Sequence, residues 1–226
     1  MGRTPAFCGV ILAAGESSRM GRDKALLPWP PQPASAPSGS TGTKTTTTTT
    51  TETFLSAAIN LFFSHVDVVL VVVGNNEAAL APVVYAHGAS LVVNPEPARG
   101  QFSSLRVGLQ EVLSRGRDAA MITLVDRPPV RMETIETLKL AFELAATHRK
   151  WAVIPEYQGT HGHPILAARE MIEAFLRAPE TSNAQEVEHA HLDEIEYVPI
   201  DDPLVAVNVD TPEQYAALPP SLLPST

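Results

Sequence analysis

Short apolar runs alternate with amphipathic segments along the first two thirds of the chain. The runs are rich in β-branched residues, as in strands buried on both faces of a parallel sheet, and they cover residues 7–12, 66–73, 90–94 and 119–125. The segments between and after them carry apolar side chains at helical spacing, at residues 52–64, 76–87, 102–114 and 131–147. This alternation predicts an α/β fold, a doubly wound and mostly parallel sheet with helices on its faces.

The last third of the chain is less regular. We expect short strands at residues 151–155, 163–167, 196–200 and 205–209, and helices at residues 168–178 and 183–191. There is no internal repeat and no second core, so residues 1–226 are expected to form a single domain. The segment at about residues 30–50 is rich in Pro, Ser and Thr, which bury little, and is expected to be a flexible surface insertion.

Composition excludes several classes of partner. The formal net charge of -9 argues against nucleic acid, because counterion release requires a basic face. The single cysteine, Cys8, lies inside the first predicted strand, where it is expected to be a small core residue. No stretch approaches the roughly 20 apolar residues that span a bilayer, and no apolar signal region opens the chain. We therefore expect a cytoplasmic protein with no membrane partner.

The turn after the first strand is a candidate phosphate site. Small residues at positions 13–15 leave the backbone accessible there, and Ser17 or Ser18 can cap a following helix. Arg19 and Lys24 add two positive charges close to the free N–H groups of that helix, an arrangement that binds anions. The spacing is neither that of a Walker A loop nor that of the G-x-G-x-x-G dinucleotide fingerprint.

Two aspartates are candidate metal ligands. Asp126 follows the strand at 119–125, and Asp210 follows the one at 205–209, so both are expected at the carboxyl edge of the sheet where ligands of open α/β folds bind. Carboxylates there can hold Mg²⁺. Each also has a purely structural reading, because Asp126 precedes two prolines and can cap the next helix, and Asp210 or Thr211 can cap a helix that begins at Pro212.

The sequence L-A-A-G-x-S-x-R-M-G-x-x-K-x-L-L-P, read from Leu12 to Pro28, resembles the opening signature of the MobA-like nucleotidyltransferases, above all the molybdenum cofactor cytidylyltransferases. Asp126-Arg127-Pro128 is similar to the Asp-x-Pro of that family, although Arg127 is a less usual occupant of the middle position. The segments 94–95, 100–106, 162–164 and 208–213 also resemble family motifs, and Asn208 replaces the first acid of the last one.

This resemblance implies a three-layer α/β/α Rossmann-like nucleotidyltransferase fold with a mostly parallel mixed sheet. It also implies transfer of a nucleoside monophosphate from a nucleoside triphosphate to a phosphorylated small-molecule acceptor, with Mg²⁺ as cofactor and release of pyrophosphate. An enzyme that receives the finished cofactor is a possible further partner.

The resemblance assigns roles to particular residues. Phosphate contacts and catalysis fall to Arg19, Lys24 and Asp126, and the metal is held by Asp126 and Asp210. Acceptor binding falls to Gly162 and His163, where His163 can equally serve only the turn. Nucleotide binding falls to Leu12, Ala13, Ala14, Gly15, Asn94, Ser103 and Ser104.

The substrates are less closely defined. In the family, Ala-Ala-Gly accompanies cytidylyl transfer and Ala-Gly-Gly guanylyl transfer, so residues 13–15 favour CTP. The implied acceptor is molybdopterin, with sugar phosphates and methylerythritol phosphate as open alternatives. A nucleotide-binding module without catalysis is an alternative of another class, and a dinucleotide oxidoreductase is disfavoured because the glycine fingerprint is missing.

Overall fold

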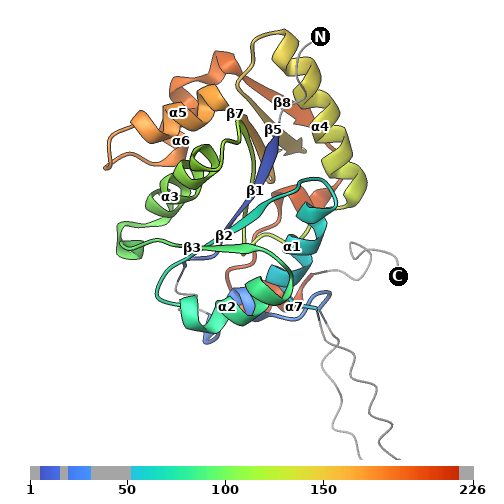
Figure 1. The fold of residues 1–226 in the computed structure, drawn as a ribbon. Helices are drawn as coiled ribbons and strands as arrows, with labels where there is room; N and C mark the ends of the chain where they lie inside the picture. Colours follow the sequence, from blue (N-terminus) through green and yellow to red (C-terminus); the bar gives the residue numbers. More distant parts are fainter. Residues whose placement is uncertain (1–5, 16–19, 32–51, 219–226) are drawn as a thin grey trace, which may run out of the picture.

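The computed structural model describes residues 6–15, 20–31 and 52–218. Their strands form one mixed sheet in the order β3-β2-β1-β4-β7-β5-β6, and β8 pairs with β5 (Figure 1). The pairs β1–β2, β1–β4, β2–β3 and β5–β8 are parallel, whereas β7 is antiparallel to β4 and β5, and β6 is antiparallel to β5. The strands are β1 (Phe7–Leu12), β2 (Val69–Val73), β3 (Ser90–Val93), β4 (Ala119–Leu124), β5 (Ala152–Tyr157), β6 (Thr160–His161), β7 (Ile165–Ala168) and β8 (Ile195–Pro199).

The side chains of β1 alternate between two hydrophobic cores, one on each face of the sheet. Phe7 and Ile11 belong to the first core, and Cys8 and Leu12 to the second. All six residues of β1 are buried, because helices cover both faces, which is why the strand reads as a continuous apolar run. Burial raises the pKa of the Cys8 thiol to about 11, so Cys8 is an inert core residue, as expected from its position.

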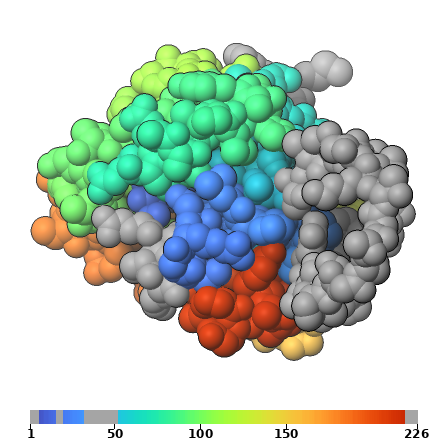
Figure 2. Space-filling model, turned by 90° about the horizontal axis from the view of Figure 1, so that it is seen from below, coloured from blue at the N-terminus to red at the C-terminus, as the bar shows by residue number. Residues whose placement is uncertain are grey.

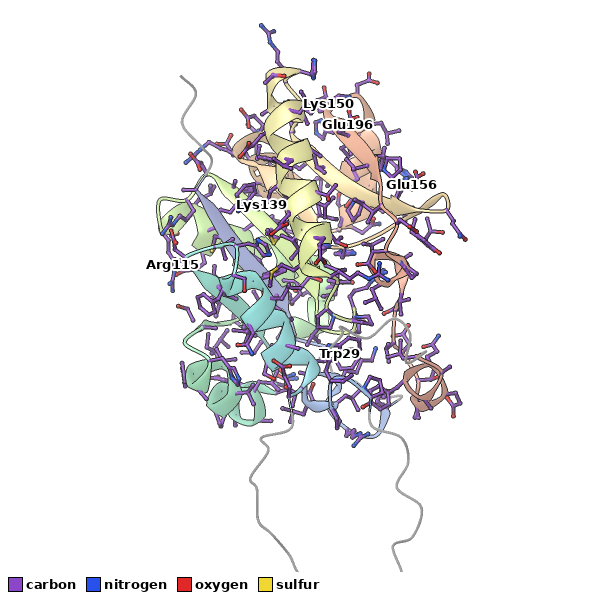
Figure 3. The ribbon with its side chains drawn as sticks, turned by 90° about the vertical axis from the view of Figure 1, so that its right-hand side faces the viewer. Trp29, Arg115, Lys139, Lys150, Glu156 and Glu196 are labelled. Carbon is purple, nitrogen blue, oxygen red and sulfur yellow. The ribbon has the colours of Figure 1, made fainter. Side chains whose placement is uncertain are left out.

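Helices cover each core and complete the three layers that the resemblance implied. The first core is covered by α1 (Phe54–Phe63), α2 (Glu77–Ala86) and α4 (Met132–Thr147). The second is covered by α3 (Gln101–Ser114), α5 (Arg169–Arg177) and α6 (Ala184–Ala190), which lie together on the other side of the sheet in Figure 1. Figure 3 looks onto α4, with Lys139 labelled beside it and Trp29 below it. None of the helices in the described ranges has the length and apolar character needed to cross a membrane.

Several local elements differ from the sequence-based expectation. Residues 205–209 form no strand, because the buried carboxylate of Asp202 caps the short helix η5 (Pro203–Ala206) by accepting from the Leu204 N–H at 3.1 Å. The same carboxylate accepts from the Thr134 hydroxyl at 2.7 Å, which ties η5 to the start of α4. The hairpin strand β6 was not predicted. Further short elements are η2 (Lys24–Leu26), η3 (Pro97–Arg99), η4 (Leu192–Glu194) and α7 (Pro212–Ala216).

The predictions for the segment between β1 and α1 can be compared with the structure only in part. The expected insertion at about 30–50 lies almost entirely outside them, as do Ser17 and Ser18, the proposed helix caps. Lys24 was placed in the first turns of an α-helix, but it lies in the 3-10 turn η2, which Asp23 caps by accepting from the Ala25 N–H at 3.0 Å.

Gly162 lies against the backbone of η5. A Cβ atom at this position would come within 2.1 Å of the Val205 carbonyl oxygen, which also accepts a hydrogen bond from the His163 N–H at 2.9 Å. Any larger residue must therefore push apart two backbone segments that are joined by a hydrogen bond.

We expect Gly162→Ala to destabilise the fold by about 1–3 kcal/mol, the usual cost of overpacking a buried contact. The change is measured as the free energy of unfolding in denaturant titrations. Thr160→Ala, at an exposed position of the same hairpin, is the matched control and is expected to stay within about 0.5 kcal/mol of the parent. A Gly162→Ala protein as stable as the parent would show that the backbone contact is not as close as described.

Candidate active site

The ends of β1 and β4 bring the predicted site residues together at one edge of the sheet. These strands are parallel neighbours, so residues 13–15 and Asp126 emerge on the same side. The space-filling view of this side shows the blue segment that includes residues 20–31 against the red C-terminal segment (Figure 2). The hydroxyl of Tyr215 donates a hydrogen bond to the Pro28 carbonyl at 2.7 Å across that contact.

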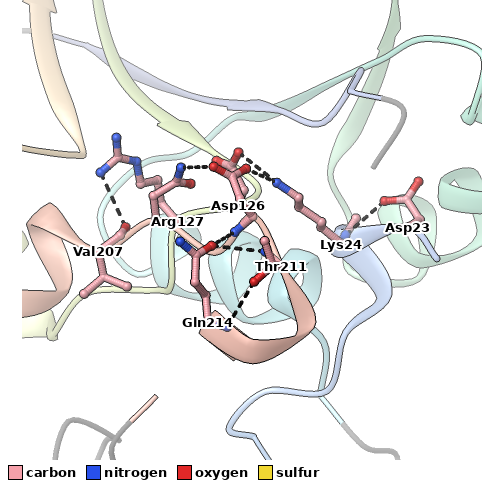
Figure 4. A network of polar contacts seen from close by, with 10 residues as sticks. Asp23, Lys24, Asp126, Arg127, Val207, Thr211 and Gln214 are labelled. Atoms are coloured by element: carbon pink, nitrogen blue, oxygen red, sulfur yellow. Dashed lines mark hydrogen bonds and ion pairs between the residues drawn. The ribbon is translucent and has the colours of Figure 1, made fainter. Parts of the chain in front are cut away.

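Lys24 lies between the two aspartates. Its Nζ is 2.6 Å from Asp210 Oδ1 and 3.5 Å from Asp126 Oδ2, and the whole residue is only 8% exposed (Figure 4). The amide of Asn208 donates to the second oxygen of Asp210 at 2.7 Å. The other oxygen of Asp126 is buried and has no hydrogen-bond partner among the described residues. The structure thus joins Lys24, Asp126 and Asp210, three of the residues to which the sequence assigned the chemistry.

A second set of contacts fixes the turn that carries Lys24. The Asp23 carboxylate accepts from the Asn76 side-chain amide at 2.7 Å, and the same amide nitrogen donates to the Ala13 carbonyl at 2.8 Å. The side-chain oxygen of Asn76 accepts from the Gly74 N–H at 3.1 Å. The ends of β1 and β2 and the Lys24 turn are therefore held together by one asparagine.

Asp126 and Asp210 are linked through the backbone. The Val209 N–H donates to the Asp126 carbonyl at 2.9 Å, next to Asp210. The Gln214 side chain accepts from the N–H of Asp210 at 2.6 Å and from that of Thr211 at 3.1 Å. The Thr211 side chain in turn caps α7, so of the two capping residues expected for this segment it is Thr211, and not Asp210, that caps the helix.

A cavity of about 530 Å³ adjoins this cluster. Of the residues assigned to the nucleotide and phosphates, it is lined by Leu12, Ala14, Gly15, Lys24, Ser104 and Asp126. Ala13 is buried behind it, and Arg19 lies outside the described residues. The cavity therefore has small residues and bare backbone on one side, and the Lys24 cation with the Asp126 carboxylate on another.

Asn94 and Ser103 do not line this cavity. The Asn94 amide nitrogen is 2.9 Å from the hydroxyls of both Ser103 and Ser104, and its oxygen accepts from the Glu96 N–H at 2.9 Å. Asn94 is 3% exposed, so in this structure it braces the loop between β3 and α3. The assignment of Asn94 and Ser103 to nucleotide binding stays a prediction.

A second cavity, of about 790 Å³, continues from the first, and the two share the wall residues Leu12, Gly100, Gln101 and Leu124. Gly162 and His163, assigned to the acceptor, both line it. Its walls include Phe102 and Phe175 on helices α3 and α5, and the stacked rings of His161 and Tyr197, whose centroids are 4.0 Å apart. Such walls suit a molecule with a flat or apolar body.

Burial changes the ionisation of two groups on this second cavity. Burial, and after it the positive charge of Arg127, lower the pKa of His163 to about 3, so the imidazole is neutral at physiological pH. Burial raises the pKa of Glu188 to about 7. The Nδ1 atom of His163 and the Nε atom of Arg127 are buried without hydrogen-bond partners among the described residues.

The residues at the first cavity fit a divalent cation. Asp126 and Asp210 already converge on one positive charge, and the buried, unpaired oxygen of Asp126 has capacity for a ligand bond. No group of three or more His, Cys, Asp and Glu side chains suited to a metal occurs in the described ranges. Mg²⁺ fits this pattern, since it is commonly bound by one or two carboxylates together with water and substrate phosphates.

Sequence reasoning missed Arg127 and Glu188 as cavity residues. Arg127 was noted only as an unusual member of its motif, and Glu188 lies on a helix whose composition suggested exposure to solvent. The one sequence signal for Arg127 is its position directly after Asp126. No periodicity marks Glu188 as a cavity residue.

Comparison with known proteins finds a matching family and related proteins. The model of the MobA-like NTP transferase domain matches residues 9–195. The molybdenum cofactor cytidylyltransferase of Escherichia coli K12 is 24% identical over 208 residues, which cover 91% of this chain and 92% of that protein. A probable molybdenum cofactor guanylyltransferase of Rhodopirellula baltica is 30% identical over 143 residues, 63% of this chain and 59% of that protein.

A solved structure is also similar to this fold. Rv0371c of Mycobacterium tuberculosis H37Rv, in complex with manganese, superposes with a TM-score of 0.67 at 22% identity, covering 96% of this chain and 97% of that one. The family match extends over most of the sheet and over Lys24 and Asp126. The chain therefore belongs to the MobA-like NTP transferase family of nucleotidyltransferases.

Proposed function

We propose that the protein is a Mg²⁺-dependent nucleotidyltransferase that moves CMP from CTP to a phosphorylated acceptor such as molybdopterin and releases pyrophosphate. The observation that carries the proposal is the placement of Lys24 between Asp126 and Asp210 on the wall of a cavity lined by the backbone of Ala14 and Gly15. An ammonium group and a metal-binding carboxylate pair are what a bound triphosphate requires.

The charges at the site support the proposal that a metal ion binds there. Among the described residues, Lys24 pairs with Asp126 and Asp210, and a triphosphate brings several negative charges into the same cavity. A divalent cation bound with the triphosphate would add positive charge that offsets them. Bound Mg²⁺ would supply that charge and polarise the phosphate oxygens.

The transfer needs no nucleophile from the protein. A phosphate monoester is largely dianionic at neutral pH, because its second pKa is about 6. An oxygen of the acceptor phosphate forms a bond to the α-phosphorus, while the bond from that phosphorus to the bridging oxygen breaks and its electron pair leaves with pyrophosphate. Lys24 stabilises the negative charge that develops, and the two adjoining cavities hold the reactants in line.

The choice of nucleotide rests on the small residues after β1. Ala14 lines the first cavity, and the related cytidylyltransferase of Escherichia coli extends over nearly all of this chain. A methyl group beside the base can favour the smaller pyrimidine over a purine. The assay that tests the whole proposal follows pyrophosphate release with CTP or GTP and a panel of acceptors, with and without a chelator. Nucleotide binding without turnover across that panel would favour the alternative of a non-catalytic module.

Replacing Lys24 with Ala should lower turnover by about 100-fold or more, which corresponds to about 3 kcal/mol of transition-state stabilisation. The reason is that the leaving pyrophosphate loses the ammonium group proposed to stabilise its charge. The measurement is steady-state pyrophosphate release. Lys139→Ala, which removes the same charge from a residue of α4 (Figure 3) that lines neither cavity and donates to the His65 carbonyl at 3.1 Å, is the control and should retain the activity of the parent. Equal turnover by the Lys24→Ala protein would refute the role of Lys24.

Mg²⁺ and CTP should stabilise the protein together far more than either does alone. In the ligand-free protein the ammonium of Lys24 is already paired with both carboxylates, so it competes with the metal until a triphosphate accepts it. The measurement is the melting temperature with each ligand and with both, since binding to the folded state raises it. In Lys24→Met, Mg²⁺ alone should raise the melting temperature more than it does in the parent. A parent protein that responds to Mg²⁺ alone as strongly as to the pair would contradict this competition.

A further inference from the structure

Arg127 is a charged residue for which the proposed transfer has so far had no use. It directly follows Asp126, but the two side chains serve different cavities, since Asp126 lines the first and Arg127 the second. Figure 4 shows Lys24 and Arg127 on opposite sides of Asp126. Lys24 thus lies at the first cavity and Arg127 at the second, on either side of a carboxylate. Arg99 also lines the second cavity, but it forms ion pairs with Glu96 and Glu180.

The guanidinium of Arg127 is poorly compensated by the protein. Its one side-chain hydrogen bond among the described residues runs from Nη1 to the Val207 carbonyl at a long 3.4 Å, and its buried Nε has no partner there. It forms no ion pair with a carboxylate in the described ranges, although Asp126 and Asp210 are near enough to act on it electrostatically. Burying a charge with so few partners is costly, and the cost is offset when an anionic ligand pairs with the group.

A second unpaired donor or acceptor lies beside Arg127. His163 lines the same cavity, its Nδ1 is buried without a partner among the described residues, and the charge of Arg127 acts on its ring. A neutral imidazole carries one N–H group and so can donate one hydrogen bond. Glu188 on α6 also lines this cavity.

The location of the pair matters for the reaction. The two cavities meet at Leu12, Gly100, Gln101 and Leu124, so a group held by Arg127 lies next to a nucleotide held by Lys24. An acceptor phosphate must reach this junction, because its oxygen has to meet the α-phosphorus. Guanidinium groups bind phosphates through two parallel hydrogen bonds and so fix their orientation.

We propose that Arg127, assisted by His163, anchors the phosphate monoester of the acceptor at the junction of the two cavities and makes this chain selective for phosphorylated acceptors. The proposal rests on the function proposed above, and it assigns to Arg127 a role in specificity: it binds the attacking group, while Lys24 binds the leaving one.

The test uses phenyl phosphate, a phosphate monoester on a flat apolar body, as the probe. It is titrated calorimetrically into the full chain, alone and with Mg²⁺ and the non-hydrolysable α,β-methylene analogue of CTP. The parent should bind phenyl phosphate but not phenol. Arg127→Gln should weaken phenyl phosphate binding by about tenfold or more, and Arg127→Lys should weaken it less. The affinity for the nucleotide analogue should stay within about twofold of the parent in both variants.

Two controls separate this role from a structural one. Arg131→Gln removes the same charge four positions along, where the side chain is exposed and bonded to the Asp201 carbonyl, and should leave both affinities unchanged. Arg127→Met removes a poorly compensated, half-buried charge, so it should melt at or above the temperature of the parent while losing phenyl phosphate binding. A residue needed only for folding would give the opposite thermal result.

The proposal is overturned if the parent does not bind phenyl phosphate, if Arg127→Gln binds it as the parent does, or if Arg127→Gln loses nucleotide and phenyl phosphate affinity equally. Failure of the parent to bind the nucleotide analogue would instead count against the proposed function. In that event the titration without nucleotide still decides whether Arg127 binds a phosphate ester.

Discussion

The active-site edge of this fold depends on one buried ammonium group. Lys24 comes from a short turn after the first strand, and its partners Asp126 and Asp210 come from segments 102 and 186 positions away along the chain. A buried charge is tolerated only when it is paired, so these three segments must meet wherever the protein is folded without ligands. The ion pairs therefore bring the proposed catalytic residues together before a substrate arrives, and under the proposed function a substrate has to replace these ion pairs.

Much of this arrangement could be predicted from the sequence, because it follows from burial. A strand covered on both faces reads as an unbroken apolar run, and the carboxyl ends of parallel strands share one edge, which placed Asp126 near Lys24. Residues 205–209 were misassigned as a strand because their apolar character is real but their geometry is set by Asp202, a carboxylate whose burial between two helices no local pattern reveals. Arg127 was missed as a cavity residue for a similar reason, since its surroundings come from elements distant in the sequence.

Asn94 illustrates a limit of motif reading. The family motif marks Asn94 as a nucleotide contact. In this structure, however, its amide nitrogen bonds to the hydroxyls of Ser103 and Ser104, and its amide oxygen accepts from the Glu96 N–H, so all three partners are groups of the protein. Asn76, which no motif marked, holds the ends of two strands and the Lys24 turn together. A polar residue can thus matter to a site as a brace or as a contact, and composition alone does not separate these roles.

The backbone from Val205 to Val209 has a consequence for how the two cavities can vary. At one end its carbonyl accepts from His163, and at the other its N–H donates to Asp126, so a single short segment is bonded to the walls of both cavities. Reshaping the backbone beside His163 would therefore disturb Asp126 and Asp210, the proposed metal ligands. An exchange of the side chain at position 127 leaves this backbone frame in place, so it can change the wall of the second cavity without moving the segment that holds Asp126.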